Sequence, residues 1–302
     1  MARKKNKRVI PSQAVSKRLQ AAYAAAIIAG VKILRKTFQP KKDIMLSELV
    51  AGNLAPAVPV VGLHFPLNAE EIAKKHLVIL ANNNRKIFQN VIKSMTGTRP
   101  VLPEKPVADL LSEYIAENVR LIKSIPVKLH GQVSDLIHGS FQTAMRPETL
   151  SKLIEERFDV AESRARLIAV DQLAKLNGDI SKQNSQDIGC EYYTWSTVQD
   201  ERVRDEPDDS HRAMEGMLCR WDDDTVYSDD GGETWNQRSD IGGPELDPGE
   251  DYRCRCVSLS VLPDTDKLKA MEDPDAPEEV DPLQHLQDFI DSQNMTQLEA
   301  AE

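Results

Sequence analysis

The chain changes character at residues 191–205, which read EYYTWSTVQDERVRD. Large and small side chains alternate here in a β-prone run, with Tyr193, Trp195 and Thr197 on one side and Tyr192, Thr194 and Ser196 on the other. A second alternation predicts a returning strand, at Val257, Leu259 and Val261. The two strands bound a small, irregular, strand-containing domain, which we place at residues 190–263.

Residues 11–178 have helical spacing instead. Apolar side chains recur there at intervals of three and four residues, for example at Phe158, Ala161, Ala165 and Ile168. Two proline-containing connectors, 54–66 and 100–106, interrupt the pattern. The sequence therefore predicts an α+β fold, in which a mainly helical N-terminal region precedes the strand-containing domain.

Three local signals predict where helices begin and end. Ser12 is the candidate N-cap of the first helix, and Asn68 followed by Glu71 has the spacing of a capping box for the second. Gly178 and the polar stretch 179–189 predict the boundary between the helical region and the strand-containing domain.

Charge is polarised along the chain. Residues 1–42 contain twelve Lys or Arg and no acidic residue, whereas residues 196–251 contain five Arg and eighteen Asp or Glu. The part from residue 252 onward carries a net charge of −8, which leaves residues 43–195 close to neutral. We expect residues 1–10 to be a disordered basic arm and residues 264–302 to be an acidic, mostly disordered tail.

The composition predicts a helix-rich soluble protein, because aromatic residues are 5% and charged residues 28% of the chain. The longest apolar run, Ala21–Val31, has about half of the ~20 residues that a membrane-spanning helix needs. No persuasive signal-peptide cleavage site follows the basic start. We therefore expect no membrane partner and a reducing compartment, in which the four cysteines are thiols or metal ligands.

The strand-containing domain holds soft ligands of the kind that bind Zn²⁺, namely His211, Cys254 and Cys256. Cys219 would complete a tetrahedral site; Asp200 or Asp205 would be alternative fourth ligands, or a fourth ligand is absent. A structural zinc ion would stabilise a domain that has so few aliphatic residues. The alternative is that the cysteines are small buried hydrophobic residues and that His211 only hydrogen-bonds to nearby acids.

Two acidic segments carry weaker signals. Ser228–Trp235 fits the Ser-x-Asp-x-Gly-x-Thr-Trp pattern of an Asp-box hairpin, but a single copy argues against a β-propeller. The cluster Asp222–Asp224 lacks the ligand alternation of an EF-hand, so we expect a solvated loop there rather than a calcium site. Familiar catalytic motifs such as a Gly-x-Ser-x-Gly elbow or His-Glu-x-x-His are absent, which lowers the prior for an enzyme.

One ordered set of residues runs through the strand-containing domain: Trp195, Asp200, Arg202, Arg204, His211, Gly216, Cys254, Arg255 and Cys256. A helical lead-in precedes it, with Arg164-Ala165 two residues before Ile168-Ala169. This order resembles the phage Mu F-like, or head morphogenesis, family of minor head proteins over about residues 150–262. The chain departs from the family at Val170-Asp171, where the family has Thr-Glu, and in its unusually acidic loop between His211 and Cys254.

The resemblance implies a non-enzymatic component of a tailed-bacteriophage head. Such a protein is present at low copy and acts at the portal or capsid in head assembly, DNA packaging or ejection. Its implied partners are the portal protein and capsid or scaffold proteins, and its implied location is the virion head, with the host cytoplasm as the place of assembly. The alternative from another class is a metal-dependent hydrolase or nuclease that uses His211 with Asp200, Asp205 or the thiols.

The basic start of the chain predicts a further partner, phage DNA. The candidate phosphate contacts are Arg3, Lys4, Lys5, Lys7 and Arg8. A basic face of the first helix is expected to be a solvated surface, with DNA or an acidic partner as the alternative ligand; it comprises Lys17, Arg18, Lys32, Arg35 and Lys36. The acidic rear of the chain would oppose DNA binding.

Overall fold

A computed structural model describes residues 8–52, 61–143, 145–263 and 268. The chain divides into two compact units, each built from separate stretches of sequence. Unit 1 takes the chain up to Val15, then Val78–Ser112, then everything from Leu173 onward. Unit 2 takes Ser16–Leu77 and Glu113–Gln172.

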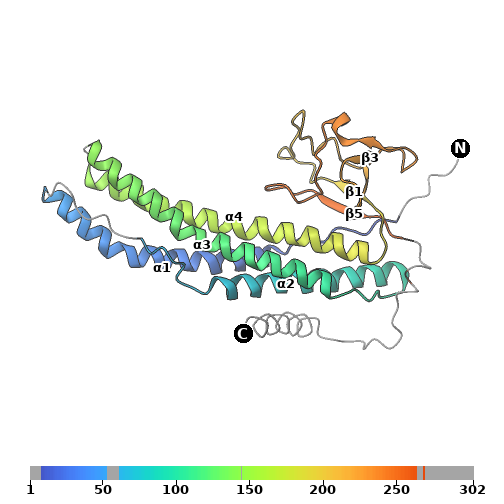
Figure 1. Cartoon of the computed structure of the whole chain (residues 1–302), viewed down its shortest axis with the longest axis horizontal. Helices are drawn as coiled ribbons and strands as arrows, with labels where there is room; N and C mark the ends of the chain where they lie inside the picture. Colours follow the sequence, from blue (N-terminus) through green and yellow to red (C-terminus); the bar gives the residue numbers. More distant parts are fainter. Residues whose placement is uncertain (1–7, 53–60, 144, 264–267, 269–302) are drawn as a thin grey trace, which may run out of the picture. The chain divides into compact units, whose positions relative to one another are not determined.

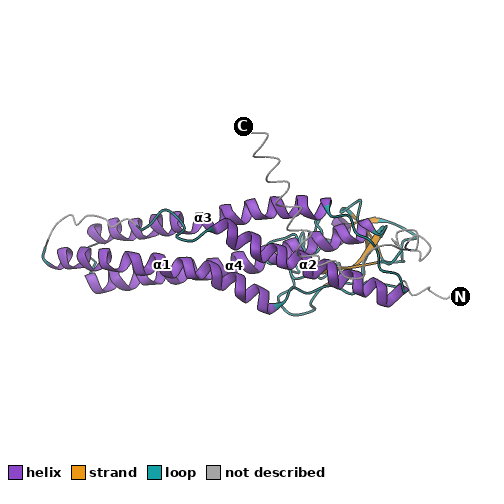
Figure 2. Ribbon diagram, turned by 90° about the horizontal axis from the view of Figure 1, so that it is seen from below, coloured by secondary structure: helices purple, strands orange, loops and turns teal. Residues whose placement is uncertain are grey.

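Among the described residues, the helical part consists of four long helices (Figures 1 and 2). They are α1 (Lys17–Val50), α2 (Ala69–Thr96), α3 (Lys105–Gln142) and α4 (Pro147–Asp187). Helices α2, α3 and α4 each contribute residues to both units. With the strands that follow, they confirm the predicted α+β fold. No helix among the described residues combines the length and the apolar character that a membrane crossing requires.

Unit 2 has a helical core in which aromatic packing is combined with hydrogen bonds and ion pairs between side chains. Phe38 of α1 packs against Phe158 of α4, with 5.8 Å between the ring centroids. Tyr23 is buried, and its hydroxyl donates a hydrogen bond to Asn118 Oδ1 at 2.7 Å. On the basic face of α1, Arg35 pairs with Asp159 at 2.6 Å. Part of that face is therefore bound to acidic residues of the same unit.

The two predicted helix caps have different outcomes. Asn68 caps α2 as expected, because its Oδ1 accepts hydrogen bonds from the backbone N–H groups of Glu70 (3.1 Å) and Glu71 (3.2 Å). Ser12 does not cap α1, which begins at Lys17. The prediction for Ser12 was wrong because the chain first runs beside the sheet before it turns into the helix.

The predicted boundary at Gly178 was also wrong, because α4 continues to Asp187. The polar residues between Gly178 and Gly189 are helical, and Asn184 and Ser185 are buried. Asn84 Nδ2 donates to Asn177 Oδ1 and to Ser181 Oγ, both at 2.9 Å, and Asn184 Nδ2 donates to Asn84 Oδ1 at 3.0 Å. The polar composition of residues 179–189 predicted a linker, but polar residues of this stretch form hydrogen bonds between α4 and α2 instead.

Helix α4 ends at a glycine in the left-handed conformation. Gly189 has φ +80°, its N–H donates to Gln186 O at 2.9 Å, and the next N–H, of Cys190, donates to Ser185 O at 2.9 Å. These two bonds are those of a Schellman motif, which needs a residue that tolerates positive φ. The chain is thereby turned from the helix into the first strand.

Unit 1 contains an antiparallel five-stranded sheet of order β4-β3-β2-β1-β5. Its strands are β1 (Tyr192–Ser196), β2 (Leu218–Arg220), β3 (Val226–Ser228), β4 (Asn236–Gln237) and β5 (Val257–Ser260). The predicted strands correspond to β1 and β5, which pair with each other, and β5 is an edge strand of the sheet. Tyr193 and Trp195 of β1 are fully buried, as their alternation indicated.

The start of the described chain covers the outer edge of β5. Ile10 N–H donates to Ser260 O at 2.8 Å, Leu262 N–H donates to Arg8 O at 2.9 Å, and Ile10 is buried. We expected residues 1–10 to be a disordered arm, but residues 8–10 are part of the sheet region. An exposed strand edge gains backbone hydrogen bonds in this way, which a charge count does not reveal. Residues 1–7 lie outside the described part.

The predicted Asp-box hairpin is present between β3 and β4 (orange in Figure 1). Asp230 accepts hydrogen bonds from Ser228 Oγ (2.6 Å), Thr234 Oγ1 (2.5 Å) and two backbone N–H groups. Gly231 and Gly232 supply the positive φ of the turn. In the preceding loop Asp222 pairs with Arg220, and Asp223 accepts from Thr225 Oγ1, so these carboxylates are bound to neighbours within the loop.

Beyond Pro263 the structure describes Leu268 alone, and this side chain is buried in the core of unit 1. The predicted acidic tail, residues 264–302, otherwise lies outside the described residues.

Candidate metal centre

His211 is the centre of the candidate site. It lies on the loop between β1 and β2, its exposed fraction is 3%, and its ring packs edge-on against Trp195 with 5.6 Å between centroids. Trp195 is itself fully buried in the sheet, so the tryptophan provides a rigid wall that fixes the position of the imidazole.

Cys254 and Cys256 bring two thiols to this imidazole from the segment that leads into β5. His211 Nδ1 lies 3.4 Å from Cys254 Sγ and 3.5 Å from Cys256 Sγ. A spacing of two residues in an extended segment directs both side chains to the same face. The one-residue gap between the cysteines, which is tight by the usual metal-site spacing, therefore suits a site completed by a distant histidine.

The other ring nitrogen of His211 faces two carboxylates. Its Nε2 lies 3.2 Å from Asp209 Oδ1 and 3.7 Å from Asp251 Oδ2, although neither contact has hydrogen-bond geometry. Arg204 pairs with both carboxylates, at 3.3 Å for Asp209, and so holds them in place. No sequence pattern distinguishes Asp209 and Asp251, because eighteen acidic residues lie between 196 and 251 and only folding selects two of them.

The remaining residues of the ordered set hold the two loops in position. Asp200 forms a two-pronged ion pair with Arg255, with both N···O distances 2.7 Å. Gly216 has φ +75°, and its N–H donates to Trp195 O at 2.9 Å, which returns the loop to the sheet. All nine residues of the set thus lie in or beside one site.

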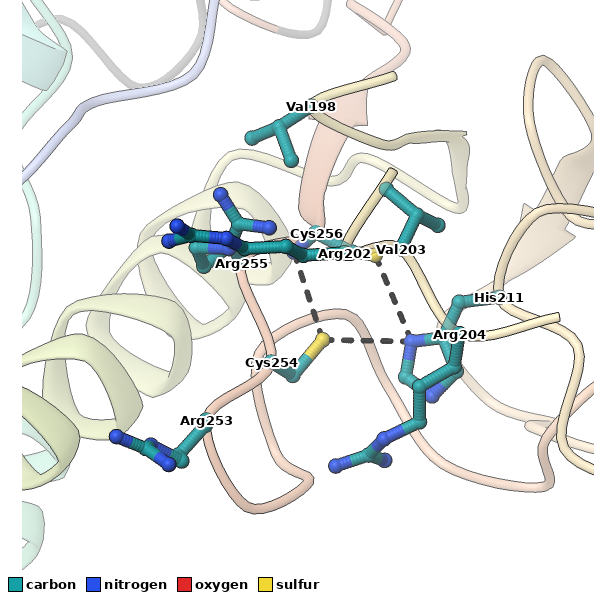
Figure 3. Close-up of a pocket in the computed structure, with 9 residues that line it drawn as sticks. All are labelled: Val198, Arg202, Val203, Arg204, His211, Arg253, Cys254, Arg255 and Cys256. Atoms are coloured by element: carbon teal, nitrogen blue, oxygen red, sulfur yellow. Dashed lines mark hydrogen bonds between the residues drawn. The ribbon is translucent and has the colours of Figure 1, made fainter. Parts of the chain in front are cut away.

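A cavity of about 40 Å³ adjoins the thiols and the imidazole (Figure 3). Four arginines contribute to its wall, together with two valines and the three candidate ligands; the lining is Val198, Arg202, Val203, Arg204, His211, Arg253, Cys254, Arg255 and Cys256. Two of the dashed lines in Figure 3 join the thiols to His211, and another joins the backbone nitrogen of Cys256 to the Cys254 thiol. His211 and Cys256 are buried, whereas most of the arginines are exposed. The cavity is large enough to hold a water molecule or an ion.

The two thiols have opposite proton affinities. Hydrogen bonds from Cys256 and from His211 lower the pKa of Cys254, against the effect of burial. The Cys254 thiolate and burial raise the pKa of Cys256. The pair therefore holds one negative charge readily in the absence of a cation, and a bound divalent cation would favour the second thiolate as well.

The structure separates the predicted fourth ligands from this group. Cys219 is buried in β2, where its thiol contacts Met217 O at 3.8 Å and burial raises its pKa to about 11. Asp200 is paired with Arg255, and Asp205 accepts a hydrogen bond from Ser210 at 2.8 Å. The prediction that Cys219, Asp200 or Asp205 completes the site is not supported, because none of them belongs to either group of candidate ligands among the described residues. One group is His211 with Cys254 and Cys256, and the other is His211 with Asp209 and Asp251. The hydrolase or nuclease reading loses its proposed acids for the same reason.

A second polar cluster in unit 1 was missed by the sequence reading. Arg238 is fully buried and donates to Tyr193 Oη at 3.0 Å and to the backbone oxygens of Val226, Pro244 and Leu246 at 2.9–3.2 Å. Tyr193 Oη in turn donates to Asp247 Oδ1 at 2.8 Å, and Asp247 pairs with Lys182 of α4. This cluster connects the loop after β4 to the sheet and to α4, and it contains no feature that points to a ligand.

Of the candidate DNA-contacting residues, only Arg8 is described. Its side chain is exposed, and its backbone bonds to Leu262. Arg3, Lys4, Lys5 and Lys7 lie outside the described residues, so the prediction for the arm stays a prediction.

A family of known proteins matches part of this chain. Residues 132–259 match the family model described as "Phage Mu protein F like protein". The match begins within α3, ends within β5 and includes every residue of the His–Cys group. An uncharacterized protein from Haemophilus influenzae is 26% identical over 191 residues, which are 62% of this chain and 38% of that protein. No solved structure matches the chain.

The chain spans less than two thirds of that relative's length, so the relative supports likeness over the shared part alone. The family match covers the end of the helical region and the strand-containing domain, which is where the ordered set from Trp195 to Cys256 forms one site. Residues 132–259 of this chain belong to the phage Mu protein F-like family.

Proposed function

We propose that this protein is a minor head protein of a tailed bacteriophage, which acts with portal and capsid or scaffold proteins during head assembly. The observation that carries the proposal is the family match over residues 132–259. The role in head assembly is inferred from the resemblance to head morphogenesis proteins. The long helices of unit 2 would offer surface for contacts with partner proteins.

The chemistry of the site supports a structural role rather than a catalytic one. Several of its charged residues are paired with one another, as in the bonds of Asp200 with Arg255 and of Arg204 with Asp209. A general base has to reach a substrate, whereas these carboxylates face arginines or the buried imidazole. The site is thus built to hold two loops together.

The test is a clean deletion of the gene from the phage or inducible prophage that carries it. We expect the infectious titre to fall to the level of a portal-gene deletion, with misassembled or DNA-free heads in electron micrographs. Wild-type protein supplied from a plasmid should restore the titre, and a chain truncated after residue 189 should not. Purified virions should contain the protein at far lower copy than the major capsid protein. Normal titre and intact heads after deletion would contradict the proposal.

DNA contact by the basic arm is a separate part of the proposal. If the five basic residues from Arg3 to Arg8 contact phosphates, the full chain should bind duplex DNA without sequence preference. Its affinity should fall by about 10²–10³-fold between 50 and 200 mM salt, because roughly five counterions are released. Fluorescence anisotropy with a labelled duplex measures this.

The control for the arm is a variant in which basic residues are replaced elsewhere in the chain. Replacing the five arm residues by Gln should abolish binding, whereas Lys123→Gln with Lys128→Gln and Lys152→Gln, at exposed positions of unit 2, should leave the salt dependence nearly unchanged. Equal losses in both variants would show a general charge effect, and no binding at low salt by the wild-type chain would remove DNA from the list of partners.

A further inference from the structure

We propose that His211, Cys254 and Cys256 bind one Zn²⁺ ion, and that this ion staples the loop between β1 and β2 to the segment that leads into β5. The proposal concerns the folded state of unit 1 and is independent of the role in phage heads. It is tested on purified protein.

The distances fit a tetrahedral zinc ion. With Zn–S bonds of about 2.3 Å and a Zn–N bond of about 2.0–2.1 Å, tetrahedral geometry puts nitrogen and sulfur ligands roughly 3.6 Å apart. The measured distances from His211 Nδ1 are 3.4 Å to Cys254 Sγ and 3.5 Å to Cys256 Sγ. The ligand atoms all lie within 4.8 Å of one another. The two nitrogen-to-sulfur distances thus lie within about 0.2 Å of the value that tetrahedral coordination requires.

The orientation of the imidazole gives a second, independent argument. A metal ion on Nδ1 leaves the proton on Nε2, and metal-bound histidines usually direct that N–H toward a carboxylate. His211 has this orientation, since Nδ1 faces the thiols and Nε2 faces Asp209 and Asp251. Nε2 is buried without a hydrogen bond among the described residues, and a modest shift of Asp209 would supply one.

A bound ion would also stabilise this domain by restraining its long irregular segments. Its strands are two to five residues long, and the loop that carries His211 runs for about twenty residues between β1 and β2. Long loops with little regular structure are held at a cost in conformational entropy. Because the ligands come from two such segments, binding of one ion restrains both.

Three protein ligands leave one position of a tetrahedral ion. Among the described residues no fourth histidine, cysteine or carboxylate belongs to the thiol–imidazole group. The adjoining cavity of about 40 Å³ is large enough for a water molecule, which we assign to the fourth position.

Metal analysis of the full chain, purified without chelators, provides the first test. We expect about one zinc ion per chain, as a single three-ligand site requires. Reconstitution with Co²⁺ should produce sulfur-to-cobalt charge-transfer absorption and the intense visible bands of a tetrahedral ion. In zinc-loaded protein Cys254 and Cys256 should resist alkylation, and chelation should expose both, as read by mass spectrometry of the labelled peptides.

Variants separate coordination from packing. Cys254→Ser and His211→Ala should lose the zinc and the cobalt spectrum, while Cys219→Ala, which removes a buried thiol outside the group, should keep both. Hydrogen exchange should rise on chelation in residues 198–216 and 249–256 and stay unchanged in α1 and in the unit 2 part of α3. If a variant fails to fold, cobalt binding and alkylation of the wild-type chain still decide the question.

Folded wild-type protein that contains no zinc and shows no cobalt spectrum on titration would overturn the proposal. The thiols and imidazole would then be a hydrogen-bonded packing cluster.

Discussion

Replacing Arg238 by Met is expected to lower the free energy of unfolding of unit 1 by about 3–5 kcal/mol. The side chain is fully buried, and its guanidinium donates to Tyr193 Oη and to three backbone oxygens. Methionine fills similar volume but donates nothing, so these acceptors lose their partners in a dry environment. The Asp247 carboxylate would also lose its favourable electrostatic interaction with the Arg238 guanidinium.

Urea unfolding followed by tryptophan fluorescence measures this effect. All three tryptophans, Trp195, Trp221 and Trp235, belong to unit 1, so their signal reports on it directly. The control is Arg220→Met, which removes a half-exposed arginine that pairs with Asp222 and should cost far less. Equal midpoints for Arg238→Met and the wild type would mean that water replaces the guanidinium without penalty.

The second large effect is expected for Trp195→Ala, which should cost about 3–5 kcal/mol in the unfolding of unit 1. Trp195 is fully buried, packs edge-on against His211, and has Arg238 above its ring at 5.7 Å. Truncation therefore leaves a cavity and removes the wall that positions the imidazole. If zinc binds as proposed, the variant should also bind it more weakly.

Circular dichroism and heat or urea denaturation check the stability change, and metal content checks the positioning role. Trp235→Ala is the matched control, because Trp235 is only partly buried and stacks on Tyr192 at the surface end of the sheet. A loss no larger for Trp195 than for Trp235 would show that the core closes over the missing indole.

Much of the architecture was predictable because it rests on local periodicity. The helical spacing of residues such as Phe158 and Ala165 and the alternation of Tyr193 and Trp195 are visible in the chain itself. Asn68 and the Asp-box residues make hydrogen bonds within a few positions, so their local patterns were sufficient. The boundary at Gly178 failed because the polar residues that follow find partners on α2, some ninety to one hundred positions away.

The sequence by itself determined the fold class, the two main strands, the family resemblance and three residues that meet at one site, His211, Cys254 and Cys256. Only the tertiary structure decided that Cys219 lies apart, that Asp209 and Asp251 face the imidazole, and that Arg238 is buried. Residue type and spacing report which chemistry a chain carries. Which of many carboxylates, thiols or guanidiniums come together depends on strand order and loop path, because those contacts join positions far apart in the chain.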